Sequence, residues 1–154
     1  MEKQEISMFN LANAYKNSYN IISDFANVKF PIQGSIDQAK MLCNIPATTL
    51  AAFSCELFMK SMLYAENTSV IRLHDLSELF KKLQSEAQRQ IRENTCSKYA
   101  ALSNKQIDFY KELDVCANLF ITSRYCYEQG VRVNMIFVRC FLQALFEYAN
   151  TVIG

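Results

Sequence analysis

Glycine and proline are scarce in this 154-residue chain, which has three Gly and two Pro. These residues supply most tight turns, so their scarcity argues against an all-β sandwich, which needs a turn after each short strand. Hydrophobic residues make up 51% of the chain, and a domain of this length buries about 68 to 70% of its unfolded surface. We therefore expect one all-α domain over residues 1–154.

Histidine and the spaced cysteines of metal sites are also missing. The chain has one His, no C-x-x-C pair and no Glu-x-x-His motif, which argues against a structural zinc or a di-iron centre. No Gly-x-Ser-x-Gly elbow or glycine-rich phosphate loop is present either, so we expect no metal and no cofactor. The six cysteines are predicted to be reduced, mostly buried thiols of a cytoplasmic protein: Cys43, Cys55, Cys96, Cys116, Cys126 and Cys140.

Positive and negative charges are nearly balanced, since the chain has 16 Lys and Arg residues and 15 Asp and Glu residues. A non-specific or DNA-specific nucleic-acid binder is therefore not indicated, and any RNA contact must be local. Residues 72–105 are mildly basic, with seven basic and four acidic side chains, and such a run is most often a solvated helix face. The most apolar windows, 45–65 and 131–153, carry internal charges, which argues against membrane spans.

Apolar residues at helical spacing predict four to five helices in an up-and-down bundle. The first runs from Ile6 to about Phe25, and residues 27–34 are expected to be a connection. Pro46 is expected to separate a short helical stretch, opened by Ser35 to Gln38, from a helix over 46–66. The remaining predicted helices begin at His74–Asp75, at a cap on Asn104 and near Asn134, while 94–103 is ambiguous.

Four charges stand out because they interrupt otherwise apolar helices. Glu56 and Lys60 are the only charges between Pro46 and Tyr64, and Arg124 is followed by Glu128 one turn later. Buried charges are costly unless they are paired, so we expect the two helices to pack with Glu56 facing Arg124 and Lys60 near Glu128. The cluster is either a structural polar network or an anion or nucleotide pocket built around Arg124 and Lys60.

The single histidine, His74, has two interpretations. At the start of a helix it is expected to make a structural hydrogen bond, and the alternative is a general base. The structural role is favoured because no catalytic partner stands near it in the sequence.

Three segments together resemble the HEPN-like (higher eukaryotes and prokaryotes nucleotide-binding) domain family. They are Ala52-x3-Glu56-Leu57-x2-Lys60-x2-Leu63, then His74-Asp75-Leu76-x2-Leu79-x3-Leu83, then Phe120-x3-Arg124-Tyr125-x-Tyr127-Glu128. The resemblance implies a bundle of four or five helices that dimerises. It also implies RNA cleavage, binding of RNA or a nucleotide, or partnership with a nucleotidyltransferase in toxin–antitoxin and defence systems.

The chain departs from the family's nuclease motif, an Arg followed four to six residues later by His. Residues 129–131, where that His would follow Arg124, are Gln, Gly and Val. Without these proton-transfer groups we expect a non-catalytic domain, a homodimer that binds RNA, a nucleotide or a partner protein. The polar cluster of Glu56, Lys60, His74, Arg124 and Glu128 would then be its ligand site. The alternative is a structural or protein-interaction bundle in which this cluster only fixes packing.

Overall fold

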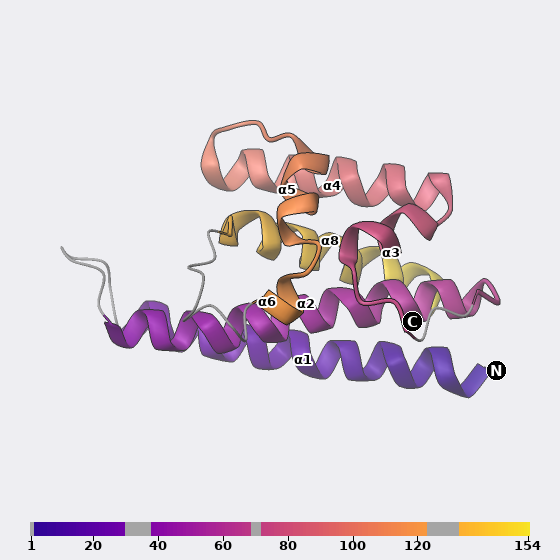
Figure 1. Ribbon diagram of the computed structural model, residues 1–154, viewed down its shortest axis with the longest axis horizontal. Helices are drawn as coiled ribbons and strands as arrows, with labels where there is room; N and C mark the ends of the chain where they lie inside the picture. The colour runs from indigo at the N-terminus through magenta and orange to yellow at the C-terminus, as the bar shows by residue number, and fades with distance from the viewer. Residues whose placement is uncertain (1, 30–37, 69–71, 123–132) are drawn as a thin grey trace.

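The chain folds as an all-α, up-and-down helical bundle (Figure 1). The computed structural model describes residues 2–29, 38–68, 72–122 and 133–154. Its helices are α1 (Glu2–Lys29), α2 (Gln38–Ala65), α3 (Leu76–Lys82), α4 (Ser85–Ser103), α5 (Phe109–Cys116), α6 (Leu119–Thr122) and α8 (Met135–Val152). The long α1 and α2 lie side by side and antiparallel, α8 packs against both α2 and α4, and α5 and α6 run steeply across them.

The α1–α2 pair is held together by close contact between small side chains. Ala12 of α1 and Ala51 of α2 are fully buried, and the Ser54 hydroxyl donates to the Ala12 carbonyl at 2.8 Å. This bond satisfies a buried hydroxyl and links the two helices directly. The prediction of an amphipathic first helix is confirmed, except that Phe25, expected on its buried stripe, is 51% exposed.

Pro46 does not interrupt the helix, so the predicted division between a short helical stretch and a helix over 46–66 is wrong. Residues 38–65 form one helix with Pro46 inside it. Near the proline, the Thr48 hydroxyl donates to the Asn44 carbonyl at 2.7 Å. An interior proline costs about 3 kcal/mol or more, and the packing of α1 along the same helix outweighs that cost. Residues 35–37 of the predicted capping box lie outside the described residues.

The helix predicted from Asp75 is correctly capped but is divided in two. The Asp75 carboxylate accepts from the Glu78 amide at 2.9 Å, as an N-cap should. The chain then leaves helical geometry at Leu83, and Gln88 donates its side-chain amide to the Leu83 carbonyl at 2.7 Å. The ambiguous stretch 94–103 is the second half of α4.

Asn104 ends a helix rather than beginning one, so that prediction is wrong. It is the C-cap of α4 in the left-handed conformation, with φ 55°, which asparagine adopts more readily than most residues. Asp108 caps α5 instead, and the predicted long helix is interrupted between α5 and α6. The start near Asn134 is confirmed, because its side chain accepts from the Phe137 amide.

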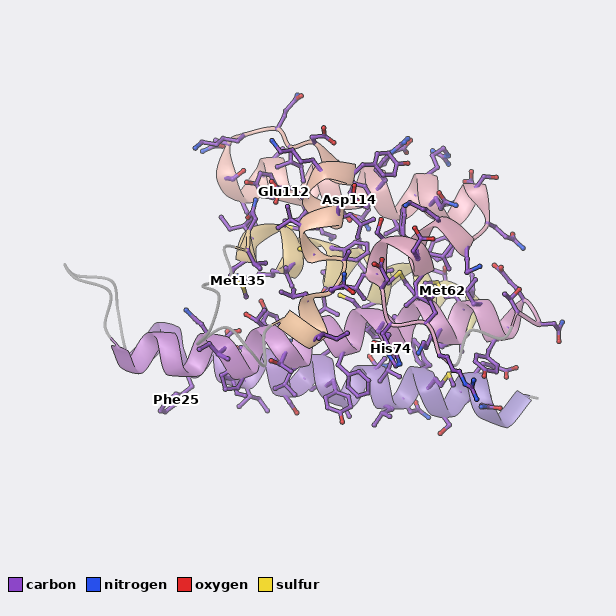
Figure 2. The ribbon with its side chains drawn as sticks, in the orientation of Figure 1. Phe25, Met62, His74, Glu112, Asp114 and Met135 are labelled. Atoms are coloured by element: carbon purple, nitrogen blue, oxygen red, sulfur yellow. The ribbon has the colours of Figure 1, made fainter. Side chains whose placement is uncertain are left out.

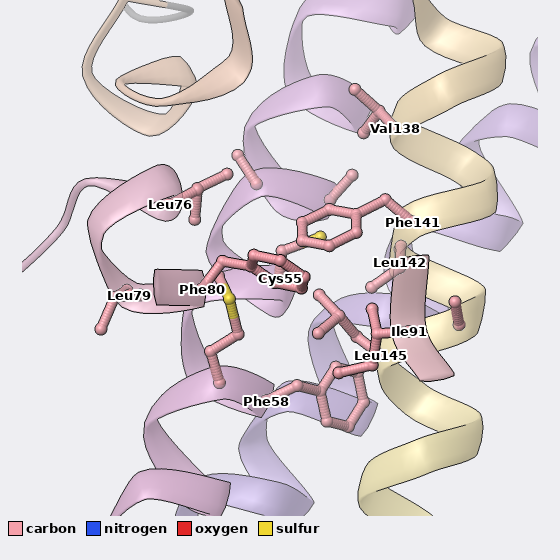
Figure 3. Packing of buried hydrophobic residues seen from close by; sticks show 14 of the residues in the cluster. Cys55, Phe58, Leu76, Leu79, Phe80, Ile91, Val138, Phe141, Leu142 and Leu145 are labelled. Carbon is pink, nitrogen blue, oxygen red and sulfur yellow. The ribbon is translucent and has the colours of Figure 1, made fainter. Parts of the chain in front are cut away.

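The core lies where α2, α3, α4, α5 and α8 meet, and aromatic rings fill much of it (Figure 3). Phe80 of α3 packs against Phe109 of α5 and Phe141 of α8, with ring centroids 5.1 and 6.0 Å away. The prediction that α2 is an interior helix is confirmed, since Phe58 and Leu63 are fully buried. Within the described segments, we find no helix with the length and apolar character that crossing a bilayer requires.

Candidate functional site

Three of the five predicted cluster residues meet at one carboxylate. Glu56 Oε1 accepts from Lys60 Nζ at 2.8 Å, one helical turn away on α2. The same oxygen lies 2.9 Å from Nδ1 of His74, in the segment that leads into α3 (Figure 2). His74 was expected to make a structural bond, and its partner is this carboxylate of α2.

This carboxylate is almost completely removed from water. The side chains of Glu56 and Lys60 are 2% and 6% exposed, whereas that of His74 is 50% exposed. The second oxygen, Glu56 Oε2, is buried and accepts no hydrogen bond from the described residues. Solvent therefore contacts this cluster at His74, and the charges of Glu56 and Lys60 are shielded from water as a pair.

Arg124 and Glu128 lie outside the described residues, so the predicted contacts of Glu56 with Arg124 and of Lys60 with Glu128 stay predictions. The segment just before them packs against the helix that carries Glu56. Helix α6 packs against α2, and the Leu76 amide donates to the Ala117 carbonyl at 2.8 Å, between α5 and α6.

A second polar site lies on another face of the bundle, between α1, α4 and α8. Side chains from these three helices line a cavity of about 520 Å³. This volume is within the range of small-molecule sites, about 300 to 1,000 Å³. Its polar lining is Lys16, Tyr19, Asn20, Asp24, Lys98, Arg139 and Gln143.

The cations of this α1–α4–α8 cavity differ in how they are balanced. Lys98 Nζ contacts Glu147 Oε1 at 2.9 Å. Lys16 Nζ sits 4.0 Å above the centre of the Phe146 ring, and burial lowers the pKa of this amine. Arg139 is exposed and forms no ion pair with any described residue. With Asp24 as the only acidic side chain of the lining, the cavity carries an excess of positive charge.

Glu147 pairs with Lys98, one of the cations that line this cavity. Burial alone would raise its pKa, but donors from Lys98, Gln143 and Asn94 hold the pKa of this carboxyl below its ordinary value. The bonds from Lys98 and Asn94, 2.9 and 2.7 Å long, join α4 to α8, and the 2.9 Å bond from Gln143 lies within α8. The charged carboxylate is therefore stabilised by the same lysine that lines the cavity.

Sequence reasoning missed this cavity, although a signal for it was present. Lys16 is the only charge between Ile6 and Ser23, and Arg139 is the only charge between Val133 and Phe146. Each is the single charge of a long helical stretch, and an isolated charge is also what singled out Glu56 and Lys60. What the sequence could not supply is that α1, α4 and α8 meet at one place.

Two cations of the basic run of residues 72–105 are paired with acids of their own helices. Arg89 pairs with Glu86 and Glu93, and Lys81 pairs with Glu78. These short-range pairs favour the solvated-face interpretation over a phosphate track. Lys98 is the member of the run that lines the cavity.

The described cysteines behave as packing thiols. Cys55, Cys116 and Cys140 are buried, and Cys96 is half-buried. Burial raises the pKa of Cys116 to about 12 and also raises that of Cys55 well above its ordinary value. A thiol held in its neutral form is a poor nucleophile and a poor metal ligand.

Comparison of the chain with protein-family models, with curated proteins and with solved structures finds no match. The HEPN-like assignment therefore stays a prediction that rests on the three segments quoted above.

Proposed function

We propose that this chain is a non-catalytic, HEPN-like binding domain that holds a nucleotide, or a nucleotide unit of RNA, in the α1–α4–α8 cavity. The observation that carries the proposal is the convergence of Lys16, Lys98 and Arg139 on one cavity of about 520 Å³. A phosphate group would bring the negative charge that this lining lacks. Arginine suits it best, because its planar fork binds phosphate through two parallel hydrogen bonds.

The non-catalytic part of the proposal rests on the groups that surround the cavity. Of its lining residues, none is a histidine, and the one carboxylate is that of Asp24. His74, the single histidine of the chain, bonds to Glu56 and is not part of that lining. RNA cleavage through the 2′-hydroxyl needs a base and an acid at the same phosphate.

The buried cluster around Glu56 supports a packing role better than a ligand role. The two charges of Glu56 and Lys60 cancel and are screened from water. An anion would have to displace an ion pair there, whereas in the cavity Arg139 has no carboxylate partner among the described residues. The partnership with a nucleotidyltransferase that the resemblance implies is a separate expectation and would use another surface.

Binding can be tested with nucleoside mono- and triphosphates in a thermal-shift screen and with a mixed-sequence RNA oligonucleotide in a gel shift. We expect stabilisation or retardation that falls as salt rises. Arg139→Gln should weaken binding by about ten- to a hundredfold, since a charged hydrogen bond is worth about 1.5–3 kcal/mol. Lys111→Gln, at an exposed site on α5, is the matched control.

Two results would contradict the proposal. If Arg139→Gln and wild type bind equally strongly, the ligand does not bind in this cavity. If no probe binds, a structural or interaction module is favoured. RNA that is shortened during incubation, with shortening lost in His74→Ala, would overturn the non-catalytic part.

A further inference from the structure

The three cations of the α1–α4–α8 cavity stand at two different ends of it. Lys16 Nζ lies 4.0 Å above the Phe146 ring and Lys98 Nζ lies 2.9 Å from Glu147 Oε1, so both lysines are level with the same turn of α8. Arg139 precedes Phe146 by seven residues, which is about two helical turns and about 10 Å along the axis. Two turns return a side chain to the same face of a helix, so Arg139 lines the cavity at its other end.

Uncharged groups line the cavity between these two ends. In Figure 1, α1 and α4 run in one direction and α8 runs in the other. Asn20 on α1 and Leu102 on α4 each come four residues after a lysine of the cavity, towards Arg139, and Gln143 comes four residues after Arg139, towards the lysines. Amides bind hydroxyl groups and base edges, and Leu102, 58% exposed, offers apolar surface. The middle of the cavity therefore suits the sugar and base of a nucleoside.

We propose that the cavity binds a nucleoside that carries a phosphate group on both its 5′ and its 3′ oxygen. This inference rests on the proposed function and narrows its ligand class. One phosphate binds Arg139, the other binds Lys16 and Lys98, and the nucleoside lies between them. The same chemistry occurs free, as a nucleoside 3′,5′-bisphosphate, and inside RNA, where each internal nucleotide has a phosphate on either side.

A single phosphate group is too small to use both ends of the cavity. Charged hydrogen bonds to its oxygens are about 2.7–2.9 Å long, whereas the two ends are about 10 Å apart along α8. The lysines are also held at their own end, Lys16 by the Phe146 ring and Lys98 by Glu147. Lys98 can still bind a ligand, because an ammonium has three N–H donors and Glu147 takes one of them. A second phosphate is therefore needed to engage the second end.

Isothermal titration calorimetry with matched adenosine and guanosine probes tests this arrangement. The 3′,5′-bisphosphate should bind at least about tenfold more tightly than the 5′-monophosphate, because the second phosphate gains charged hydrogen bonds of its own. The 5′-diphosphate is the matched control ligand, since its two phosphates lie on one side of the nucleoside. It should bind more weakly than the 3′,5′-bisphosphate.

Variants at the lysine end locate the second phosphate. Lys98→Gln and Lys16→Gln should each lower the ratio of the bisphosphate affinity to the monophosphate affinity, and the double variant should bring it close to one. Lys98→Gln also removes a bond to Glu147, whereas the amine lost in Lys16→Gln contacts a ring, so agreement between them excludes an effect of that ion pair. Lys111→Gln, at an exposed site on α5, should leave the ratio unchanged. Thermal melts verify that each variant is folded.

A 5′-phosphorylated RNA trinucleotide distinguishes the two sources of the ligand. If it displaces the bisphosphate in a competition titration, and the double lysine variant weakens its binding, RNA supplies the two phosphates. If the trinucleotide does not compete, the site belongs to the free bisphosphate. Both results keep the two-phosphate site.

The failure of this inference can be told from the failure of the proposed function. If the bisphosphate and the monophosphate bind equally and Arg139→Gln weakens both, the cavity is a nucleotide site with one phosphate position, and only the two-phosphate inference is wrong. A 5′-diphosphate that binds as tightly as the 3′,5′-bisphosphate overturns it too, as does an affinity ratio that the double lysine variant leaves unchanged. If no nucleotide probe and no RNA binds, the inference and the proposed function fail together.

Discussion

The buried ion pair on α2 allows a direct test of what holds this bundle together. In Lys60→Met the methionine keeps most of the stem, but Glu56 loses the 2.8 Å bond from Nζ while its side chain stays about 2% exposed. Removing one partner from a buried pair costs about 3–5 kcal/mol, because the remaining charge stays out of water. A domain of this size has about 5–15 kcal/mol of stability in total, so the loss is a large fraction of it.

Urea denaturation followed by circular dichroism gives the free energy of unfolding, and thermal melting gives an independent check. At about 2–4 °C per kcal/mol, the midpoint should fall by roughly 6–20 °C. Lys81→Met is the matched control, because it breaks a 2.9 Å pair with Glu78 whose side chains are more than half exposed, and it should change stability little.

A double variant separates the charge effect from the packing effect. In Glu56→Leu/Lys60→Met both charges are replaced by apolar side chains, and His74, half exposed, can turn to water. Such replacements are often neutral or stabilising by about 1–4 kcal/mol, so the double variant should be far more stable than Lys60→Met. If Lys60→Met loses no more stability than Lys81→Met, the explanation by a buried, mutually dependent pair is wrong.

Four further outcomes follow from the core, a helix cap and two ionisable groups. Phe80→Ala should lower the unfolding free energy by about 3–5 kcal/mol in urea titrations, because the ring is fully buried among aromatic neighbours. Asp75→Ala should lower it by about 1 kcal/mol through loss of the α3 cap, and an equal loss in Asp75→Asn would argue against capping. Because folding lowers the pKa of Glu147, its contribution is complete above the ordinary value of 4.5 and is lost as the pH falls through the lowered pKa; unfolding curves of Glu147→Gln and wild type should therefore converge in acid. With a pKa of about 12, Cys116 is thiolate in only about one molecule in 10⁴ at pH 8, so peptide mass spectrometry should find it alkylated by iodoacetamide only after unfolding.

The periodicity of apolar residues was sufficient to predict the fold class and most of the buried stripes. Leu76, Leu79 and Phe80 are buried as their spacing indicated. The helix breaks were harder, because the turn after Leu83 contains neither glycine nor proline and depends on a side-chain bond from Gln88. Asn104 shows a related ambiguity, since asparagine suits both an N-cap and a left-handed C-cap.

The candidate sites divide in the same way. Glu56 and Lys60 could be predicted as a pair because their i,i+4 spacing on an apolar helix is local information. The approach of His74 to the same oxygen, across the loop that joins α2 to α3, is a tertiary contact. The cavity between α1, α4 and α8 depends on the relative placement of three helices, which no local pattern encodes. That Lys16 and Arg139 line the same cavity can therefore be seen only in the folded chain.

The position of α8 between α2 and α4 also sets an order for biosynthesis. The ribosome releases α8 after every other described helix, yet Phe137, Phe141 and Leu145 of α8 fill the centre of the core. Until then the nascent chain can form the α1–α2 hairpin from neighbouring segments, but the apolar surface of α2 that α8 will cover stays open to water. During translation, chaperones or rapid synthesis of α8 must therefore protect that surface against aggregation. A chain that ends before Met135 should be captured by the quality-control machinery instead of accumulating as a smaller folded bundle.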